Sequence, residues 1–323
     1  MPRHPLPAPA VAQMPGAVFS RLAPRIAARD GQVASDVIEW HRLRQGRGTY
    51  DEVIDFLDRN LDWPGLDWLR TKSEPAVAKQ SHTNVLAFFS TAPPKTATGT
   101  LAYARALASQ GRDSEADNAI VNAWLNFRMS AQEQALYLGA YSSLLKGHHT
   151  ARLDQMLWQG WNSDASRMNA LVSDGWQKLA QARMALRKRQ DGVNALIDKV
   201  PPSLKSDPGL AYERFSWRAS KGLESALELL LERSTSAKSL GRPDIWAPRR
   251  RSMARAQMRQ GNSKRAYKIA SQNFLEGGSD YADLEWLAGY IALQKLNDPE
   301  TALEHFGRFD AAVASPISKG RAG

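Results

Sequence analysis

The sequence contains no cysteine. Thiol catalysis, disulfide bonds and cysteine-based metal sites are therefore excluded, while the compartment stays open because exported and cytosolic proteins can both lack cysteine. Runs of alternating β-branched residues are nearly missing too, which argues against β-strands. No apolar stretch reaches the roughly 18 residues that a membrane-spanning helix needs. The expected class is a helical protein without a membrane span.

Motifs that carry catalysis or bind cofactors are equally scarce. Six histidines are present, but none belongs to a His-Glu-x-x-His motif or pairs with a carboxylate at a spacing that suits a metal. The phosphate-binding glycine loops and the Gly-x-Ser-x-Gly elbow are absent as well. His148 and His149 would point in different directions on a helix, so we interpret them as a loop or capping pair. The sequence thus predicts no catalytic, cofactor-binding or metal-binding residue.

The charge balance is strongly basic. Lys and Arg number 43 against 33 Asp and Glu, which gives a net charge of +10. Such a balance favours anionic partners, namely nucleic acid, acidic glycans or an anionic membrane surface, without choosing among them. Solvated arginines on the outer faces of helices explain the same composition. Apolar residues make up 43% of the chain, which indicates a globular fold.

The N-terminal segment differs from the rest in composition. Arg3 and an Ala-x-Ala-like match at residues 8–10 are typical of an export signal, but four prolines between positions 5 and 15 interrupt any apolar segment. We interpret residues 1–20 as a disordered leader or the remnant of a signal. The folded domain is expected to span residues 21–323.

A recurrent unit dominates the chain from residue 21 onward. An apolar helix ends at a Gly or Asn that can adopt the left-handed conformation, and a second helix begins a few residues later. The copies are residues 108–124, 258–274, 293–309 and, more weakly, 218–233. About one turn into each second helix stands a small residue that allows two antiparallel helices to approach closely, namely Ala116, Ala266, Ala302 and Ala226.

Tandem αα-hairpins stack into a solenoid, because one pair cannot bury its apolar face alone. The sequence therefore predicts an all-α fold, a right-handed α-superhelix of tandem αα-hairpins that is similar to a tetratricopeptide (TPR) solenoid with irregular spacing. Three turn-rich stretches interrupt the pattern. Residues 90–99 form a loop, residues 199–209 are the best candidate for an internal break, and residues 241–248 are interpreted as a short connection.

Two stretches concentrate positive charge. The stretch of residues 246–260 is predicted to be helical and carries the strongest cluster of arginines, among them Arg249, Arg250, Arg251 and Arg255. They either bind an anion or nucleic acid, or pair with acidic neighbours and lay their stems over apolar surface, and we favour the pairing. Residues 183–190 end a helix, where cations complement the helix dipole and need no ligand.

Tryptophan is frequent, with ten residues. Its ring is also what carbohydrate sites use for stacking. Most of these residues, however, lie at helical spacing beside Leu and Ala, as in residues 283–293. Packing between hairpins is therefore the default interpretation.

Several segments, taken in order, resemble one known family. They begin with a Trp-x-Arg-Leu-Arg stretch at residues 40–44 and with "DFLDRNLDWPG". They continue through "GRDSEADNAIVNAW", "HHTARLDQMLWQG", "DPGLAYERFSWRASKG" and "YADLEWLAGYIALQKLNDPETALEHF" to "SPISKGRAG". Over roughly residues 30–323 the chain resembles the superhelical domain of soluble lytic murein transglycosylases, a bacterial periplasmic family.

The resemblance implies a long α-superhelix followed by a lysozyme-like catalytic domain, in which the Glu of a Glu-Ser motif acts as acid and then as base. Such lyases cleave the muramic acid–glucosamine bond of peptidoglycan and form a 1,6-anhydro ring during cell-wall turnover. The Glu-Ser pair of this chain, Glu224-Ser225, lies in an amphipathic helix and lacks the Gly-Leu-Met-Gln-like stretch that follows the family motif. We therefore expect Glu224 not to be catalytic.

The resemblance predicts a non-catalytic superhelical scaffold, truncated before the catalytic domain and inactive alone. It would lie in the periplasm against peptidoglycan or cell-wall proteins, with no cofactor and no membrane span. A helical-repeat adaptor that binds a peptide or protein in its concave face is the alternative. Nucleic-acid binding through Arg249–Arg255 is a third hypothesis, which we disfavour.

The C-terminal end carries its own expectation. Ser315 and Pro316 are typical of the N-cap and first residue of a helix, which would be too short to be stable alone. We expect residues 315–323 to be loosely packed. An apolar patch should lie partly bare beside them, formed by Phe306, Phe309, Ala312, Val313 and Ile317.

Overall fold

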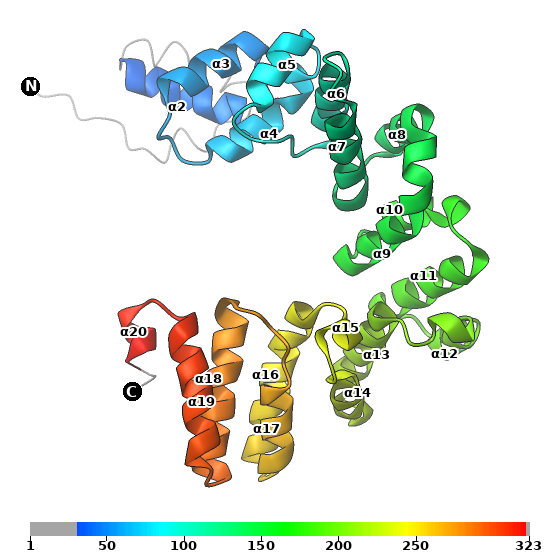
Figure 1. Ribbon diagram of the computed structural model, residues 1–323, viewed down its shortest axis with the longest axis vertical. Coiled ribbons are helices and arrows are strands. Elements are labelled where there is room, and N and C mark those ends of the chain that lie inside the picture. Colours follow the sequence, from blue (N-terminus) through cyan, green and yellow to red (C-terminus); the bar gives the residue numbers. More distant parts are fainter. Residues whose placement is uncertain (1–30, 321–323) are drawn as a thin grey trace, which may run out of the picture. The chain divides into compact units, whose positions relative to one another are not determined.

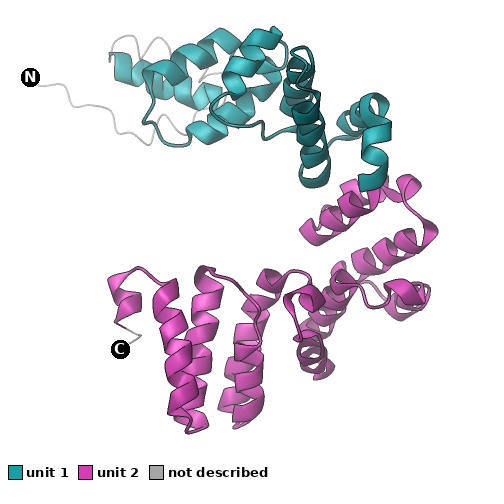
Figure 2. Ribbon diagram, viewed as in Figure 1, with its two compact units in different colours: residues 1–148 teal, residues 149–323 magenta. Residues whose placement is uncertain are grey.

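The computed structural model describes residues 31–320, and this range is helical, with no β-strand. The predicted all-α class is therefore confirmed (Figure 1). The chain forms two compact units, residues 1–148 and 149–323 (Figure 2). The turn-rich stretch at residues 199–209 lies inside the second unit. The expected leader, residues 1–20, lies outside the described residues.

The first unit is a series of consecutive helices with its own apolar core. Leu43, Phe56, Leu69 and Phe88 are among the buried side chains of that core. The elements are α2 (Gln32–Leu43), α3 (Tyr50–Arg59), α4 (Leu66–Val77), α5 (His82–Phe89), α6 (Ala97–Ala108), α7 (Asp113–Asn126), α8 (Ala131–Leu145) and the 3-10 turn η2 (Lys146–His148).

The second unit continues the pattern. The elements are α9 (His149–Gln159), α10 (Asn162–Arg167), η3 (Asn169–Leu171), α11 (Asp174–Arg187), α12 (Val193–Asp198), η4 (Pro202–Leu204), α13 (Pro208–Ser220), α14 (Ser225–Arg233), α15 (Ala237–Leu240), α16 (Pro243–Arg259), α17 (Ser263–Ser271), α18 (Gly278–Lys295), α19 (Pro299–Ala312) and α20 (Pro316–Lys319). One apolar core runs through the helices from α13 to α18.

The predicted hairpins are present as α6–α7, α13–α14, α16–α17 and α18–α19, and each pair packs together. The turns carry the expected left-handed residue, with φ of 73° at Gly111, 69° at Gly222, 84° at Gly261 and 55° at Asn297. The three glycines allow the main chain to close the end of the preceding helix. At Gly111, for example, the next amide, of Arg112, donates to Leu107 O at 3.1 Å.

The alanine of each second helix is buried, as the sequence predicts. Ala226 and Ala266 are fully enclosed, Ala302 is 1% exposed and Ala116 is 4% exposed. Neighbouring hairpins also pack on one another, since α17 contacts α18. The tandem arrangement of helical hairpins is therefore confirmed, and the right-handed sense of a superhelix stays a prediction. Within residues 31–320, no helix combines the length and the apolar character of a membrane span.

The loop predicted at residues 90–99 is confirmed over residues 90–96 between α5 and α6, but α6 already begins at Ala97. A buried carboxylate holds this loop. Glu74 on α4 accepts hydrogen bonds from the amides of Lys95 at 2.7 Å and Thr96 at 2.9 Å. Gly99 lies so close that a Cβ there would fall 2.2 Å from Glu74 Oε2. The glycine is thus required for this close approach.

The interpretation of residues 241–248 as a connection is wrong beyond Arg242, because α16 begins at Pro243. Proline at the first helical position removes no hydrogen bond, so Pro243 starts the helix. Trp246 is fully buried, stacks on Phe215 at a centroid distance of 4.6 Å and donates to Leu240 O at 3.1 Å. Burial of this large ring outweighs the hydrogen bond that Pro248 removes from the helix.

The C-terminal expectation is partly confirmed. Ser315 caps α20 by accepting from the amide of Ser318 at 3.2 Å, and Ile317 is 84% exposed. Phe309 contradicts the expectation, because it is 2% exposed. It lies on the face of α19 that packs against α18, so no further hairpin is needed to cover it.

Candidate functional site

Glu224 occupies the N-cap position of α14, and its side chain is 63% exposed. Its Oε1 lies 2.7 Å from Nη1 of Arg265. A general acid of the lysozyme type needs a desolvated carboxylate. This solvated ion pair offers no such environment, which agrees with the expectation that Glu224 is not catalytic.

His148 ends η2 and His149 begins α9, so the histidine pair lies where two helical segments meet. Both histidines are thus helical rather than in a loop, and a capping role stays a prediction. In the described part of the chain, no three His, Asp or Glu side chains gather as metal ligands would.

The arginines of residues 246–260 lie in different environments along α16. Arg251 pairs with Asp280 at 3.1 Å and with Asp283, as the pairing interpretation predicts. Arg250 is fully buried and instead donates to the main chain of Ile269 and to Ser234 Oγ. The stretch is therefore not one exposed basic face, which weakens the nucleic-acid hypothesis.

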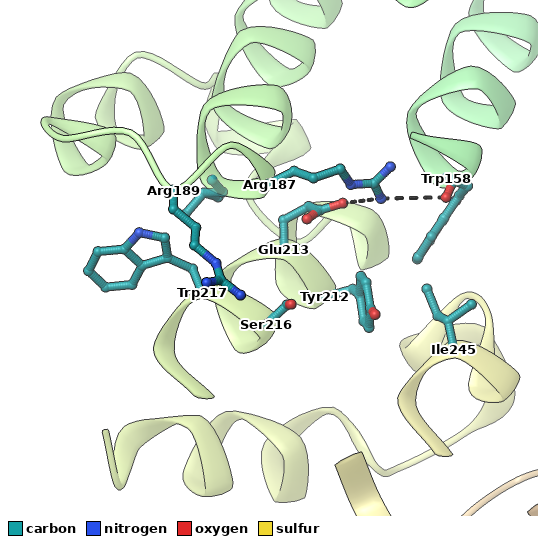
Figure 3. A pocket seen from close by; sticks show the side chains of 9 residues that line it. Trp158, Arg187, Arg189, Tyr212, Glu213, Ser216, Trp217 and Ile245 are labelled. Carbon is teal, nitrogen blue, oxygen red and sulfur yellow. Dashed lines mark hydrogen bonds and ion pairs between the residues drawn. The ribbon is translucent and has the colours of Figure 1, made fainter. Parts of the chain in front are cut away.

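A pocket that the sequence did not indicate lies in the second unit, where the ends of α9 and α11 and the start of α16 meet α13 (Figure 3). Its volume is about 220 Å³. One half is apolar and aromatic, and the other half is polar. The lining residues are Trp158, Leu186, Arg187, Arg189, Tyr212, Glu213, Ser216, Trp217 and Ile245.

An ion pair between Arg187 and Glu213 forms one wall of this pocket. Nη2 of Arg187 contacts Glu213 Oε1 and lies 3.4 Å from the main-chain oxygen of Trp158 (Figure 3). Burial raises the pKa of Glu213, and the charge of Arg187 opposes that rise. Gly160 permits the contact, because a Cβ there would lie 2.5 Å from Arg187 Nη1.

Arg183, one turn before Arg187 on α11, contacts Trp158 in the aromatic half of the pocket. It is 1% exposed, and its Nη1 lies 2.5 Å from Asp154 and 3.5 Å from Asp207. Its guanidinium also lies over the ring of Trp158, 5.0 Å from the centroid. A Cβ at position 209 would lie 2.1 Å from Arg183 Cζ, so Gly209 leaves room for this cation.

Arg189 stands out by its backbone. Its φ is 55°, a left-handed conformation at the end of α11, whereas three of the four hairpin turns place Gly at that point. A non-glycine residue there costs about 1–2 kcal/mol. This conformation places the Arg189 side chain in the polar half of the pocket, beside Ser216 and Trp217 (Figure 3).

A second pocket, of about 330 Å³, adjoins the first. The two share Leu186 and Trp217 as wall residues. Arg214 lies one turn before Trp217 and Arg218 on α13. Burial and the neighbouring Arg218 lower the pKa of Arg214. The residues of this pocket are Leu186, Val193, Asn194, Ile197, Asp198, Arg214, Trp217 and Arg218. Together we name the two cavities the α13 double pocket.

This site was not expected from the sequence, because residues 183–190 were interpreted as a helix end that needs no ligand. In the structure, Arg183 is enclosed, Arg187 is paired and Arg189 lines a pocket. A signal was present in α13, where Arg214, Trp217 and Arg218 share one side of a helix. The default interpretation of tryptophan as core holds for Trp246, and Trp217 packs against the core beside α11 while it also lines both cavities.

The arrangement is suited to binding rather than to acid–base catalysis, since the buried carboxylate Glu213 is held by Arg187. Aromatic rings, guanidinium groups and hydroxyl groups line the pocket. Comparisons with protein families, with curated proteins and with solved structures found no match for this chain.

Proposed function

We propose that the chain is a non-catalytic helical scaffold of a peptidoglycan lytic transglycosylase that works in the periplasm. The observation that carries the proposal is the tandem packing of hairpins with buried alanines at equivalent positions. The ordered sequence segments that resemble the superhelical domain of this family support it. The scaffold would lie against the cell wall and restrict which glycan strands reach a catalytic centre.

The proposal predicts binding to peptidoglycan without its cleavage. The net charge of +10 favours attraction to an anionic wall polymer, and this attraction should weaken as salt screens it. The solvated ion pair of Glu224 gives no reason to expect cleavage by that residue.

Purified sacculi provide the test. The protein is expected to sediment with sacculi and to release no 1,6-anhydro muropeptides. Retention on heparin resin at matched salt is the control for unspecific charge attraction. Release of 1,6-anhydro products would contradict the non-catalytic role. Sedimentation that disappears at the salt concentration that strips the protein from heparin would contradict specific wall binding.

A second candidate function is a helical-repeat adaptor for a peptide or protein partner. The α13 double pocket favours it, because its lining combines aromatic rings with guanidinium groups. The two candidates are compatible if the scaffold holds a protein partner beside the wall. Binding assays with different ligands distinguish the two candidate functions, with sacculi for the first and peptides for the second.

A further inference from the structure

The α13 double pocket consists of two cavities that share Trp217 of α13 as a wall residue. Tyr212, Glu213, Ser216 and Trp217 face the first cavity. The second cavity takes Arg214, Trp217 and Arg218 from the same helix. At 3.6 residues per turn these positions cover about two-thirds of the circumference of α13, and Trp217 lies between the residues of the first cavity and those of the second. A ligand that fills both cavities must therefore cross the ring of Trp217.

Two guanidinium groups of this surface make no hydrogen bond or ion pair within residues 31–320, although the charge of Glu232 acts to raise the pKa of Arg214. Arg187 is paired with Glu213, and Arg218 donates to Ser225 O at 3.2 Å. Arg189 lines the first cavity and Arg214 the second, and neither side chain makes an ion pair or hydrogen bond within residues 31–320. Two positive charges are thus available to a ligand, one on each side of Trp217.

The backbone of Arg189 supports a role for its side chain. A left-handed residue at a helix end is normally Gly, because a Cβ is unfavourable there. Here the main chain closes α11 in the usual way, with the amide of Gln190 donating to Ala185 O at 3.1 Å. A strained residue at a cavity suggests that its side chain has a function.

The apolar half of the first cavity offers a place for one side chain. Trp158 and Tyr212 face each other with centroids 6.0 Å apart, and Ile245 lies beside them (Figure 3). Each cavity is near or below the lower end of the range of about 300–1,000 Å³ for small-molecule pockets. Each volume therefore suits a single side chain of a longer chain better than a whole cofactor.

We propose that the α13 double pocket binds an extended acidic peptide segment of a partner protein. One apolar side chain of the segment packs in the first cavity against Trp158, Tyr212 and Ile245. Carboxylates on either side of Trp217 pair with Arg189 and Arg214.

The lining chemistry favours a peptide over a nucleic acid. Glu213 and Asp198 stand among the lining residues and would repel a continuous phosphate backbone. A peptide can place its few carboxylates at the arginines and leave neutral residues near these two acids. Guanidinium groups bind carboxylates through paired hydrogen bonds, which gives the pairing direction as well as strength.

This inference rests on the adaptor candidate and is independent of wall binding. Fluorescein-labelled peptides of about 12 residues, with Leu and Glu in alternation, are titrated with the full chain while anisotropy is recorded. Peptides with Gln or Lys in place of Glu are the comparison. We expect saturable binding of the Glu peptide that weakens with salt. Equal binding of the Gln peptide would overturn the proposal.

Variants identify the site. The double variant Arg189→Gln/Arg214→Gln is expected to weaken binding of the Glu peptide at least about tenfold, since each charged hydrogen bond contributes substantially. Arg259→Gln, an exposed residue at the end of α16 outside both cavities, removes a charge elsewhere and should change affinity less than about twofold. Unchanged binding by the double variant, or equal weakening by Arg259→Gln, would overturn the assignment.

Two measurements guard against misinterpretation. Circular dichroism shows whether each variant is folded, and Arg189→Lys, which keeps the charge, should retain more affinity than Arg189→Gln. Wall-derived stem peptides are titrated in parallel, and a clear preference for them over the Glu peptide would overturn the assignment to a partner protein. Failure of the sacculi assay with peptide binding intact would affect the wall role alone.

Discussion

Arg250 donates a 2.9 Å hydrogen bond from Nη1 to the main-chain oxygen of Ile269 in the core of the second unit. Ile269 lies in the last turn of α17, where carbonyls lack helical partners and the helix dipole is negative. Arg250 Nη2 also reaches Ser234 Oγ at 2.6 Å. Burial lowers the pKa of Arg250 to about 10, so it remains charged at neutral pH. This buried cation is stabilised by one helix-end carbonyl and one serine hydroxyl rather than by a carboxylate.

Substitution of Arg250 should test that arrangement. Arg250→Ala leaves a cavity and an unpaired carbonyl, and should lower the free energy of unfolding by about 3 kcal/mol. Arg250→Met fills most of the volume with apolar atoms and should cost clearly less. Thermal unfolding by circular dichroism measures both, with the exposed Arg259→Ala as control. Equal losses for Ala and Met would show that the volume of the side chain is not what matters.

Close packing at the repeated alanines should be sensitive to size. Ala302 is 1% exposed at the interface of α19 with its neighbour α18. Ala302→Leu is expected to cost about 1–3 kcal/mol, because a larger side chain forces the two helices apart. Ala311→Leu on the same helix is the control, since Ala311 is exposed. A similar midpoint of unfolding for both variants would contradict the role of the alanine in hairpin packing.

The hairpins, the start of α16 and the double pocket differ in how far the local sequence could predict them. A turn residue with positive φ and an alanine four or five residues later are local signals, so the hairpins were predictable. The start of α16 was missed because Pro243 and Pro248 look like helix breakers, whereas Trp246 gains enough from burial to keep the helix. The double pocket depends on helices far apart in the chain. In sequence, buried Arg183 cannot be distinguished from a solvated arginine.

The pairing of Arg187 with Glu213 should depend on Gly160. Gly160→Ala adds a Cβ 2.5 Å from Arg187 Nη1 at a φ of 71°. Gly192→Ala is a matched control, because its φ is also 71° but nothing lies within 4 Å. The control should cost about 1–2 kcal/mol from backbone strain. Gly160→Ala should cost about 1 kcal/mol more, because it displaces a partner of a buried carboxylate.

Differential scanning calorimetry compares the midpoints of these two variants. The expectation is a lower midpoint for Gly160→Ala than for Gly192→Ala. Equal midpoints would mean that the Arg187 side chain moves away from residue 160 without loss of stability. The ion pair with Glu213 would then not contribute to stability.

Stability should fall in acid partly through Glu285. This carboxylate is 4% exposed, and Oε2 lies 2.8 Å from His305 Nδ1 and 2.7 Å from Arg308 Nε. Burial alone would raise its pKa, but hydrogen bonds from His305, Arg308 and Asn273 outweigh burial and lower the pKa below 4.5. The folded state therefore holds this proton less tightly than the unfolded state. The resulting stability is complete above pH 4.5 and is lost as the pH falls through the lowered pKa.

Glu285→Gln tests this pH dependence. At pH 7 the variant should be less stable than the wild type by about 2 kcal/mol, since it loses hydrogen bonds to a charged acceptor. The difference should shrink as the pH falls below 4.5. Urea unfolding at several pH values measures it, with Glu304→Gln, whose side chain is 69% exposed, as control. A difference that stays constant down to the acid transition would contradict a lowered pKa of Glu285.

The hairpin tips have a practical consequence. A Cβ at Gly111 or Gly261 would meet no atom within 4 Å, and the neighbouring Gln110 and Gln260 are exposed. Because the chain has no cysteine, Gln110→Cys or Gln260→Cys would introduce the sole thiol of the protein. A fluorophore or spin label can then be attached at one chosen point of either unit, with no native residue removed to prevent labelling elsewhere.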